Sequence, residues 1–291
     1  MPGNRSRAMK IVLVSGLSGS GKTVALNSLE DNGYYCVDNL PAMLVLEVVN
    51  LLADAGHERV ALSVDARSAS LHALPESVAR LRARGDDCRV LYLEAGTQAL
   101  LRRFQETRRR HPLTSGEFTL AEAIEHEREL LAGVAEIGDR IDTSDLQAKV
   151  LRTWIDELLG APGSPLTLLF ESFAFRSGIP LDADWVIDAR MLANPYYEPA
   201  LRALTGRDAP VTEFLDGQES AQRLLGDIRS FLARWLPDIA SGNRSYLTVA
   251  IGCTGGRHRS VYLAERLAAG FRSDWRVLVR HRALAAEAAA P

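Results

Sequence analysis

Eight residues near the N-terminus have the types and spacing of a phosphate-binding loop. They fit the pattern G-x-x-x-x-G-K-[ST] at every fixed position, and they are Gly16, Leu17, Ser18, Gly19, Ser20, Gly21, Lys22 and Thr23. Glycines let the backbone curl so that its N–H groups point at phosphate oxygens. We expect Lys22 to neutralise the β- and γ-phosphates and the Thr23 hydroxyl to join the Mg²⁺ shell. The pattern predicts an ATP–Mg²⁺ site, and a chance glycine turn is the alternative.

Acidic residues follow the ends of three predicted strands, and phosphoryl chemistry needs a carboxylate for Mg²⁺. Asp38, Asp65 and Glu94 stand where ligands bind in open α/β sheets. Glu94 resembles a Walker B acid, with Glu in place of the usual Asp. Asp65 opens the segment 65–68, which is suited to hold a base, a second phosphate or the metal. A helix N-cap or a solvated loop carboxylate is the alternative for each acid.

A cationic segment follows the fourth predicted strand. Residues 102–112 contain Arg102, Arg103 and the run Arg108–Arg110. The segment resembles the lid of nucleoside-monophosphate and small-molecule kinases, which brings arginines onto the transferring phosphate. A solvated helix face paired with glutamates is the alternative. The candidate catalytic residues are therefore Lys22, Asp65, Glu94 and Arg109.

A second glycine-containing loop lies near the C-terminus and consists of Cys253, Thr254, Gly255, Gly256, Arg257, His258, Arg259 and Ser260. It matches C-x₅-R-S, the anion loop of cysteine phosphatases, in which a thiolate attacks phosphorus. No segment identifies the aspartate acid that such an enzyme needs. We therefore favour binding of a phosphorylated small metabolite without cysteine chemistry. Cysteine phosphatase activity and a purely structural turn remain alternatives, and Arg190 and Asn194 are expected to line the same pocket.

The elements that must position these loops alternate in a βα rhythm. The first half has predicted strands at 10–15, 35–37, 60–64, 89–93 and 140–142. Its predicted helices are 23–32, 42–55, 75–84, 97–138 and 146–159. After a Gly/Pro/Ser linker at 160–165 the rhythm restarts. The second half has predicted strands at 166–171, 185–188, 246–251 and 275–279, and helices at 218–236 and 261–270.

This rhythm predicts an α/β protein with two domains. Residues 9–160 should form a P-loop kinase-like parallel-sheet domain, and residues 165–282 a smaller α/β domain with its own anion-binding loop. Residues 1–8 and 283–291 are expected to be flexible.

Composition excludes several classes of protein. The chain has 291 residues, of which 47% are hydrophobic and 24% charged. It has no apolar run of about 18 residues, so we expect no membrane span. The net charge of −3 argues against a protein that coats nucleic acid globally. Three cysteines give no disulfide framework. We therefore expect a cytoplasmic protein. A homo-oligomer is a separate expectation, which composition does not establish.

The motifs together resemble the RapZ/YvcJ family of bacterial P-loop nucleotide-binding proteins, also called RNase adapter proteins. The resemblance runs from Met9 to about Arg282. It rests on residues 16–23, 37–41, 65–68, 106–112, 141–144, 172–173, 178–180, 188–190, 194–195 and, most specifically, 253–260. It implies ATP at Gly16–Thr23 and weak ATPase and GTPase activity. It also implies GTP contacts at Asp65, Ala66, Arg67 and Ser68.

In some members the resemblance also implies RNA binding through a basic C-terminal tail and delivery of a small RNA to an endoribonuclease. The residues that match the start of such a tail are Arg276, Arg280, His281 and Arg282. The alanine-rich end 283–291 departs from it, and fewer phosphate contacts mean weaker binding. A solvated strand end is the alternative. Beside a regulatory NTPase, a small-molecule kinase and an RNA adapter with no essential catalysis remain open.

Overall fold

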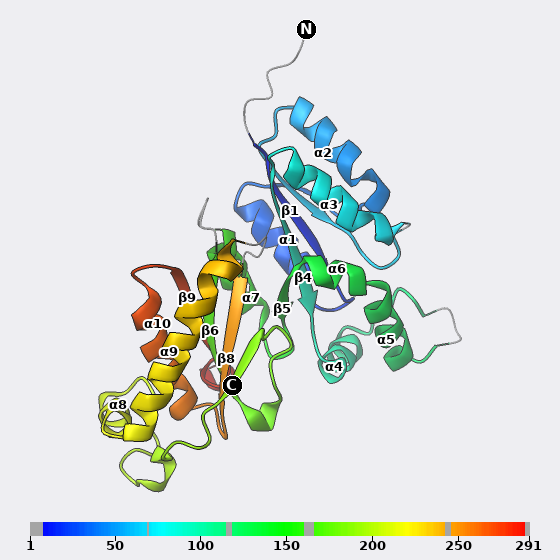
Figure 1. The fold of residues 1–291 in the computed structure, drawn as a ribbon. Helices are drawn as coiled ribbons and strands as arrows, with labels where there is room; N and C mark the ends of the chain where they lie inside the picture. Colours follow the sequence, from blue (N-terminus) through cyan, green and yellow to red (C-terminus); the bar gives the residue numbers. More distant parts are fainter. Residues whose placement is uncertain (1–7, 69, 115–117, 160–165, 242–245, 289–291) are drawn as a thin grey trace. The chain divides into compact units, whose positions relative to one another are not determined.

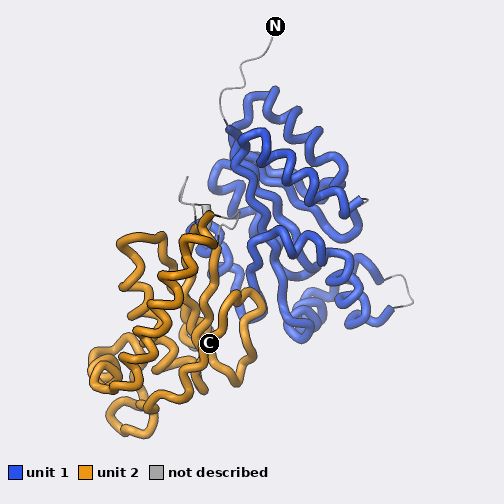
Figure 2. The backbone as a smooth tube through the Cα atoms, in the orientation of Figure 1, with its two compact units in different colours: residues 1–162 blue, residues 163–291 orange. Residues whose placement is uncertain are grey.

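The computed structural model describes residues 8–68, 70–114, 118–159, 166–241 and 246–288 (Figure 1). The chain divides into two compact units, residues 1–162 and 163–291 (Figure 2). Each unit has its own parallel sheet. The linker expected at 160–165 lies outside the described residues, as do residues 1–7 and 289–291 of the expected flexible ends.

The first unit is built on a five-stranded parallel sheet with the order β2-β3-β1-β4-β5. Its strands are β1 (Lys10–Gly16), β2 (Tyr35–Val37), β3 (Arg59–Ser63), β4 (Asp87–Glu94) and β5 (Asp139–Asp142). The central strand β1 is apolar and buried from Ile11 to Val14, as expected for a parallel strand with helices on both faces. The expected α/β fold class is therefore confirmed for this unit.

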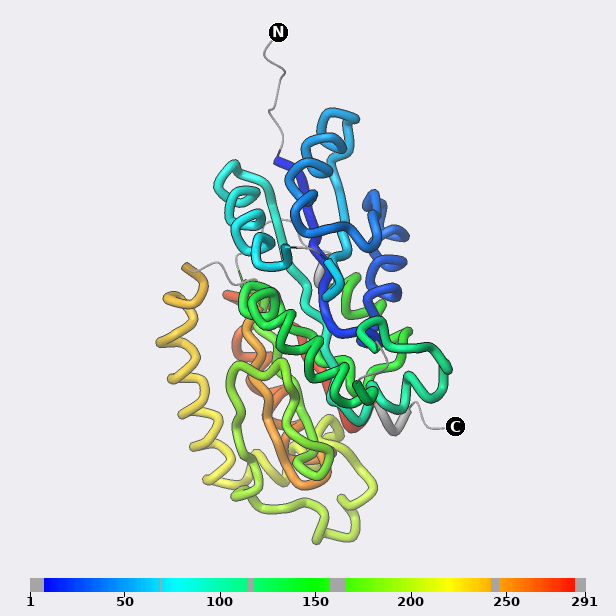
Figure 3. The backbone as a smooth tube through the Cα atoms, turned by 90° about the vertical axis from the view of Figure 1, so that its right-hand side faces the viewer, coloured from blue at the N-terminus to red at the C-terminus, as the bar shows by residue number. Residues whose placement is uncertain are grey.

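The helices of the first unit form two groups around the sheet (Figures 1 and 3). Helices α1 (Lys22–Asp31) and α7 (Ala148–Leu159) contact each other. Helix α3 (Leu74–Ala83) contacts both α2 (Val45–Asp54) and α6 (Ala132–Ile137). The short helices η1 (Ala42–Leu44) and η2 (Leu71–Ala73) precede α2 and α3.

The predicted helical region 97–138 is three helices rather than one. Helix α4 (Thr97–Thr107) ends at Arg108, which has a left-handed φ of 52°. Helix α5 (Leu120–Leu130) begins with a capping box, in which the Thr119 side chain accepts from the Glu122 N–H and the Glu122 side chain accepts from the Thr119 N–H. Helix α6 follows directly. Arg102 and Arg103 of the cationic segment therefore lie in α4, and Arg108–Arg110 lie in the connection between α4 and α5.

The second unit has a four-stranded parallel sheet with the order β7-β8-β6-β9. Its strands are β6 (Thr167–Ala174), β7 (Trp185–Asp188), β8 (Tyr246–Cys253) and β9 (Arg276–His281). Its helices are η3 (Phe175–Ser177), η4 (Pro195–Tyr197), α8 (Ala209–Asp216), α9 (Glu219–Ala240), α10 (Arg259–Phe271) and α11 (Arg282–Ala288). Strand β6 is buried along its whole length. A second α/β domain after the P-loop domain is thus confirmed.

The alanine-rich end of the chain differs from the flexible tail that we expected. Residues 282–288 form helix α11, which contacts β6. Alanine has the highest helix propensity, so the composition that suggested fraying favours this helix. None of the helices in the described ranges is both long enough and apolar enough to cross a membrane.

Candidate functional site

The loop between β1 and α1 has a backbone shaped for an anion. Gly16, Gly19 and Gly21 have φ angles of 139°, 84° and 107°, which favour glycine. The Gly19 carbonyl accepts a hydrogen bond from Arg103 (3.0 Å) and the Ser20 carbonyl one from the Thr143 hydroxyl (2.9 Å). Because the C=O and N–H of one peptide point in opposite directions, anchoring the Ser20 carbonyl outward turns the next N–H inward.

Lys22 folds back over this loop. Its Nζ donates to the Gly16 carbonyl at 2.7 Å and to the Leu17 carbonyl at 3.1 Å. Burial lowers the pKa of Lys22, while the carboxylates of Glu127, Asp65 and Asp38 oppose that shift. The ammonium therefore stands inside a group of acids at the helix N-terminus, where the first N–H groups have no partner within the helix.

The two turns that follow β2 and β3 come together beside the loop. Asp65 accepts from the Arg67 side chain at 3.0 Å (Nε) and 2.5 Å (Nη2), and Arg67 also reaches the Asn39 side chain at 3.4 Å. The Ser68 hydroxyl accepts from the Ala42 N–H at 2.6 Å. Sequence motifs 38–41 and 65–68 therefore form one structural feature, and Ala66 within it is buried.

The residues near the loop fit an Mg²⁺ ion that is held mainly by phosphate oxygens. The Thr23 side chain is exposed in the first turn of α1. Asp65 and Asp38 are close enough to Lys22 to influence its pKa. Within the described ranges no cluster of three or more His, Cys, Asp or Glu side chains could hold a metal alone. Mg²⁺ in nucleotide sites keeps several waters and takes one or two protein ligands plus phosphates.

Glu94 does not have the free carboxylate that a Walker B role requires. It is 1% exposed, and both of its oxygens accept from Arg140, at 2.7 and 2.8 Å. Arg128 lies 3.6 Å away. A metal at Glu94 would have to compete with Arg140, whose side chain is 46% exposed, for a carboxylate that is itself buried. Asp65, past the end of the strand on the other side of β1, is likewise paired, with Arg67, so both acids stay predictions for the metal site.

The cationic segment divides into two parts. Arg103 binds the loop and also donates to the Thr143 hydroxyl at 3.1 Å. Burial lowers the pKa of its guanidinium. Arg108, Arg109 and Arg110 are exposed. The structure therefore leaves Arg109 available to a ligand but does not place it on the loop.

Two residues at the loop had no assigned role from the sequence. Glu127 of α5 is 1% exposed and accepts hydrogen bonds from the Ser18 N–H (2.8 Å) and hydroxyl (2.7 Å). Thr143 was recognised only as part of a family motif. A signal for Glu127 exists, because it lies three and four residues after the buried Ile124 and Ala123. A charge on the apolar stripe of a helix indicates a buried partner.

The second loop surrounds the sulfur of Cys253, which is 3% exposed and lies 3.2 Å from the Ser260 hydroxyl. Burial opposes ionisation of this thiol. Hydrogen bonds from Ser260 and from the Gly256 backbone, together with the charge of Arg259, outweigh burial and lower its pKa. Gly256 has a φ of 67°. The loop thus directs hydrogen-bond donors and the charge of Arg259 at the sulfur, at the start of α10.

The two arginines of this loop donate to carbonyl groups of neighbouring backbone. Arg259 donates to the carbonyls of Arg190 (2.9 Å) and Leu192 (3.1 Å). Arg257 donates to the carbonyls of Leu204 (3.0 Å) and Ala203 (2.6 Å). Both guanidiniums therefore hold neighbouring backbone, which disfavours the phosphatase alternative.

Of the two other residues expected at this pocket, only Arg190 is joined to the loop by a hydrogen bond in the described part of the chain. The Arg190 carbonyl is joined to the loop through Arg259, while its side chain lies over the Phe175 ring. Asn194 accepts from the Tyr196 N–H instead.

The residues expected to begin an RNA-binding tail are mostly interior. Arg280 is 7% exposed, and the Arg282 side chain lies 3.8 Å from Glu171 and 3.9 Å from Asp182. His281 bonds to Ser172 (2.9 Å) and Glu265 (3.1 Å). These three side chains are largely buried, so a contact with RNA would require them to become exposed, and the RNA role stays a prediction. Arg276 is partly exposed.

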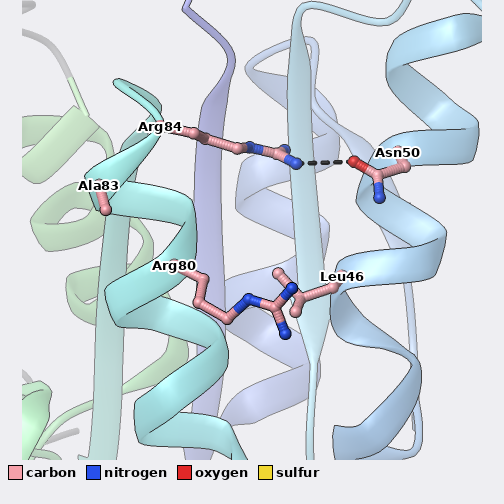
Figure 4. Close-up of a pocket in the computed structure, with 5 residues that line it drawn as sticks. All are labelled: Leu46, Asn50, Arg80, Ala83 and Arg84. Atoms are coloured by element: carbon pink, nitrogen blue, oxygen red, sulfur yellow. Dashed lines mark hydrogen bonds between the residues drawn. The ribbon is translucent and has the colours of Figure 1, made fainter.

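A cleft of about 400 Å³ lies elsewhere in the first unit, between α2 and α3 (Figure 4). Arg80 and Arg84 point into it, and Arg84 donates to Asn50 at 2.6 Å. No residue of the Gly16–Thr23 loop lines it.

The fold and the first loop define a two-unit P-loop α/β protein. The chain belongs to the RapZ family: residues 9–163 match the model of the RapZ-like N-terminal domain, and residues 166–285 match that of the RapZ C-terminal domain. This confirms the resemblance found in the sequence.

Among its relatives is a protein of Methylobacillus flagellatus that is 57% identical, covering 95% of this chain and 99% of its own. One of Chromobacterium violaceum is 55% identical with the same coverage. Both are named nucleotide-binding protein. A shikimate kinase from Acinetobacter baumannii is 18% identical, covering 52% of this chain and 93% of its own, with a TM-score of 0.37.

Proposed function

We propose that the protein is a regulatory nucleotide-binding protein that takes ATP with Mg²⁺ at Gly16–Thr23, contacts GTP through Asp65–Ser68 and hydrolyses these nucleotides slowly. The observation that carries the proposal is the preformed loop, in which Arg103 and Thr143 anchor two carbonyls outward beside the Lys22 ammonium. Preorganised amides cost little rearrangement when phosphate arrives. Slow hydrolysis agrees with Glu94 being bound by Arg140 and with Arg109 lying off the loop.

Isothermal titration with ATP and GTP in the presence of Mg²⁺ tests this proposal. Lys22→Ala should weaken binding by about tenfold to a hundredfold, since it removes charge-assisted hydrogen bonds to phosphate. Lys149→Ala is the matched control, because Lys149 is exposed on α7. Equal affinity of the Lys22→Ala variant and the wild type would refute the site.

A small-molecule kinase is the second candidate, favoured by the exposed Arg109 in the α4–α5 connection. It requires an acceptor that accelerates ATP consumption and leaves as a phosphorylated product. ADP release should be measured with sugars, nucleosides and shikimate-like acids. If none raises the rate above that with water, the kinase hypothesis fails.

For the second unit we propose a phosphorylated small metabolite at Cys253–Ser260. The lowered pKa of Cys253 supports the proposal, because the same hydrogen bonds and the charge of Arg259 that favour the thiolate would favour another anion in this loop. Arg259 Nε is buried without a hydrogen-bond partner among the described residues. Titration of inorganic phosphate and a hexose phosphate should show binding that Thr254→Val weakens and Thr212→Val leaves unchanged. No binding to the wild type would refute the proposal.

Homo-oligomer formation and RNA delivery to an endoribonuclease stay predictions from the sequence.

A further inference from the structure

The cleft between α2 and α3 is lined by hydrogen-bond donors and apolar groups. Its walls are formed by Leu46, Asn50, Arg80, Ala83 and Arg84 (Figure 4). Among the described residues, no carboxylate side chain lines it. Its volume of about 400 Å³ lies within the range of roughly 300–1,000 Å³ that is typical of small-molecule sites. The cleft therefore has the size of a ligand site and a lining that suits an anion.

Arg84 is held in place before any ligand arrives. Its Nη1 donates to Asn50 Oδ1 at 2.6 Å, and its Nε donates to Asp86. Asp86 also accepts from the Met9 N–H at 3.1 Å, which ties this pair to the residue before β1. Because a guanidinium can only donate, the amide oxygen of Asn50 faces Arg84, and the Asn50 NH₂ group is left to donate to a ligand.

Arg80 lies one helical turn before Arg84, and both guanidiniums extend from α3 toward α2 (Figure 4). Like charges at this spacing destabilise a helix. Asp86 compensates the charge of Arg84. No described residue forms a hydrogen bond or an ion pair with the exposed Arg80 guanidinium. The side chains that line the cleft therefore carry a positive charge that nothing in the described part of the chain neutralises.

We infer that this cleft is a binding site for a small organic anion that carries a carboxylate or a phosphate group. A guanidinium binds either group through two parallel N–H···O contacts, which an ammonium cannot form. The anionic group would lie between Arg80, Arg84 and the Asn50 amide. A short apolar body would lie against Leu46 and Ala83. Binding would then offset the repulsion between the two arginines.

The cleft is separate from the nucleotide site. Arg84 follows the last residue of α3, and β4 then begins at Asp87, which pairs with Lys10 at the start of β1. The loop Gly16–Thr23 begins at the other end of β1, and a strand of this length spans roughly 20 Å. An anion in the cleft would therefore bind in addition to the nucleotide and not in its place, as an effector does.

Side-chain NMR of the full-length protein tests the inference during titration with succinate and, separately, with inorganic phosphate. The probes are the Nε–H signal of Arg84 and the NH₂ signals of Asn50, which are assigned by their loss in Arg84→Lys and Asn50→Leu. Arg80→Gln removes the uncompensated charge. Arg152→Gln is the matched control, since it makes the same change at an exposed residue of α7 that does not line the cleft. Sodium chloride at equal ionic strength controls for screening, and thermal melting verifies folding.

The inference predicts that at least one of the two anions shifts these signals to saturation, with a dissociation constant of about 1 mM or below. The anion that binds more tightly identifies the group that the site prefers. Arg80→Gln should weaken binding by about tenfold, since it removes a charge-assisted hydrogen bond, and Arg152→Gln should leave it unchanged.

Four results would each overturn the inference without affecting the proposed nucleotide site. They are the lack of a saturable shift with either anion, equal shifts with sodium chloride, shifts confined to residues 16–23 or 253–260, and equally tight binding by Arg80→Gln.

Discussion

Arg103 binds the carbonyl oxygen of Gly19 at 3.0 Å, and this contact joins α4 to the phosphate loop across 84 residues of sequence. The guanidinium also donates to the hydroxyl and carbonyl of Thr143, which itself holds the Ser20 carbonyl. The shape of the loop therefore depends on residues from α4 and from the end of β5, in addition to its own glycines.

Replacing Arg103 should loosen the loop without unfolding the unit. We expect Arg103→Ala to weaken ATP binding by about tenfold, because one charged hydrogen bond to the loop is lost. Titration calorimetry measures this effect. Arg102→Ala, at an exposed neighbour, is the control and should bind as the wild type does. Equal loss in both variants would mean that only net charge matters.

Gly16 should tolerate no side chain. A Cβ there would lie 1.9 Å from the Leu93 carbonyl oxygen, at a φ of +139°. We expect Gly16→Ala to lower the free energy of unfolding by about 3 kcal/mol, through backbone strain and displacement of β4. Gly85 also has a positive φ, of +93°, but a Cβ there would meet no atom within 4 Å. We therefore expect Gly85→Ala to lower the free energy of unfolding by only about 1 kcal/mol. If urea unfolding shows that both variants lose a similar amount of stability, the close approach of residue 16 to the Leu93 carbonyl is not what limits the substitution.

The order in which the three cysteines ionise follows from their surroundings. The pKa of Cys253 is lowered from 9.0 by hydrogen bonds that outweigh burial, whereas burial raises the pKa of Cys36 to about 11 and that of Cys88 to about 12. Thiolate absorbance should therefore show its first step below pH 9, and Cys253→Ser should remove that step. A first step that survives in Cys253→Ser would contradict the assignment.

The sign of the stability effect of Cys253 is fixed by the same shift. The pKa of Cys253 is lower in the folded than in the unfolded protein, so ionisation of this thiol stabilises the folded state. That stabilisation is complete above the pKa of the unfolded state and is lost as pH falls through the pKa of the folded state. The free energy of unfolding of the wild type, relative to Cys253→Ser, should therefore rise with pH across that window below 9. A difference that stays constant with pH would be inconsistent with a lowered pKa.

Arg282 should matter for folding of the second unit. Its side chain is 9% exposed between Glu171 and Asp182. Arg282→Ala leaves two buried carboxylates without this cation, so we expect a loss of about 3 kcal/mol in unfolding free energy. Arg272→Ala, at an exposed site, should change it by less than about 0.5 kcal/mol. Wild-type stability for Arg282→Ala would reopen an RNA-contact role for this residue.

Local sequence patterns predicted most of the strands and helices of the first unit. The partners of its buried charged side chains depend on contacts between residues far apart in the sequence. The apolar run at 10–15 predicts β1, and the loop motif predicts the glycine conformations that follow it. The pairing of Glu94 with Arg140, which lies 46 residues away, was not foreseen. The contact of Glu127 with Ser18 spans 109 residues. No local pattern reports such pairings, although the charge on the buried stripe of α5 indicated that a partner exists.

The claim that the loop binds a triphosphate is tested most directly by amide NMR of the protein during titration with MgATP. The account predicts that the largest shifts fall on the N–H groups of Gly19, Gly21, Lys22 and Thr23, and that Lys22→Ala suppresses them. Shifts confined to other parts of the chain, with these four amides unchanged at saturation, would contradict it.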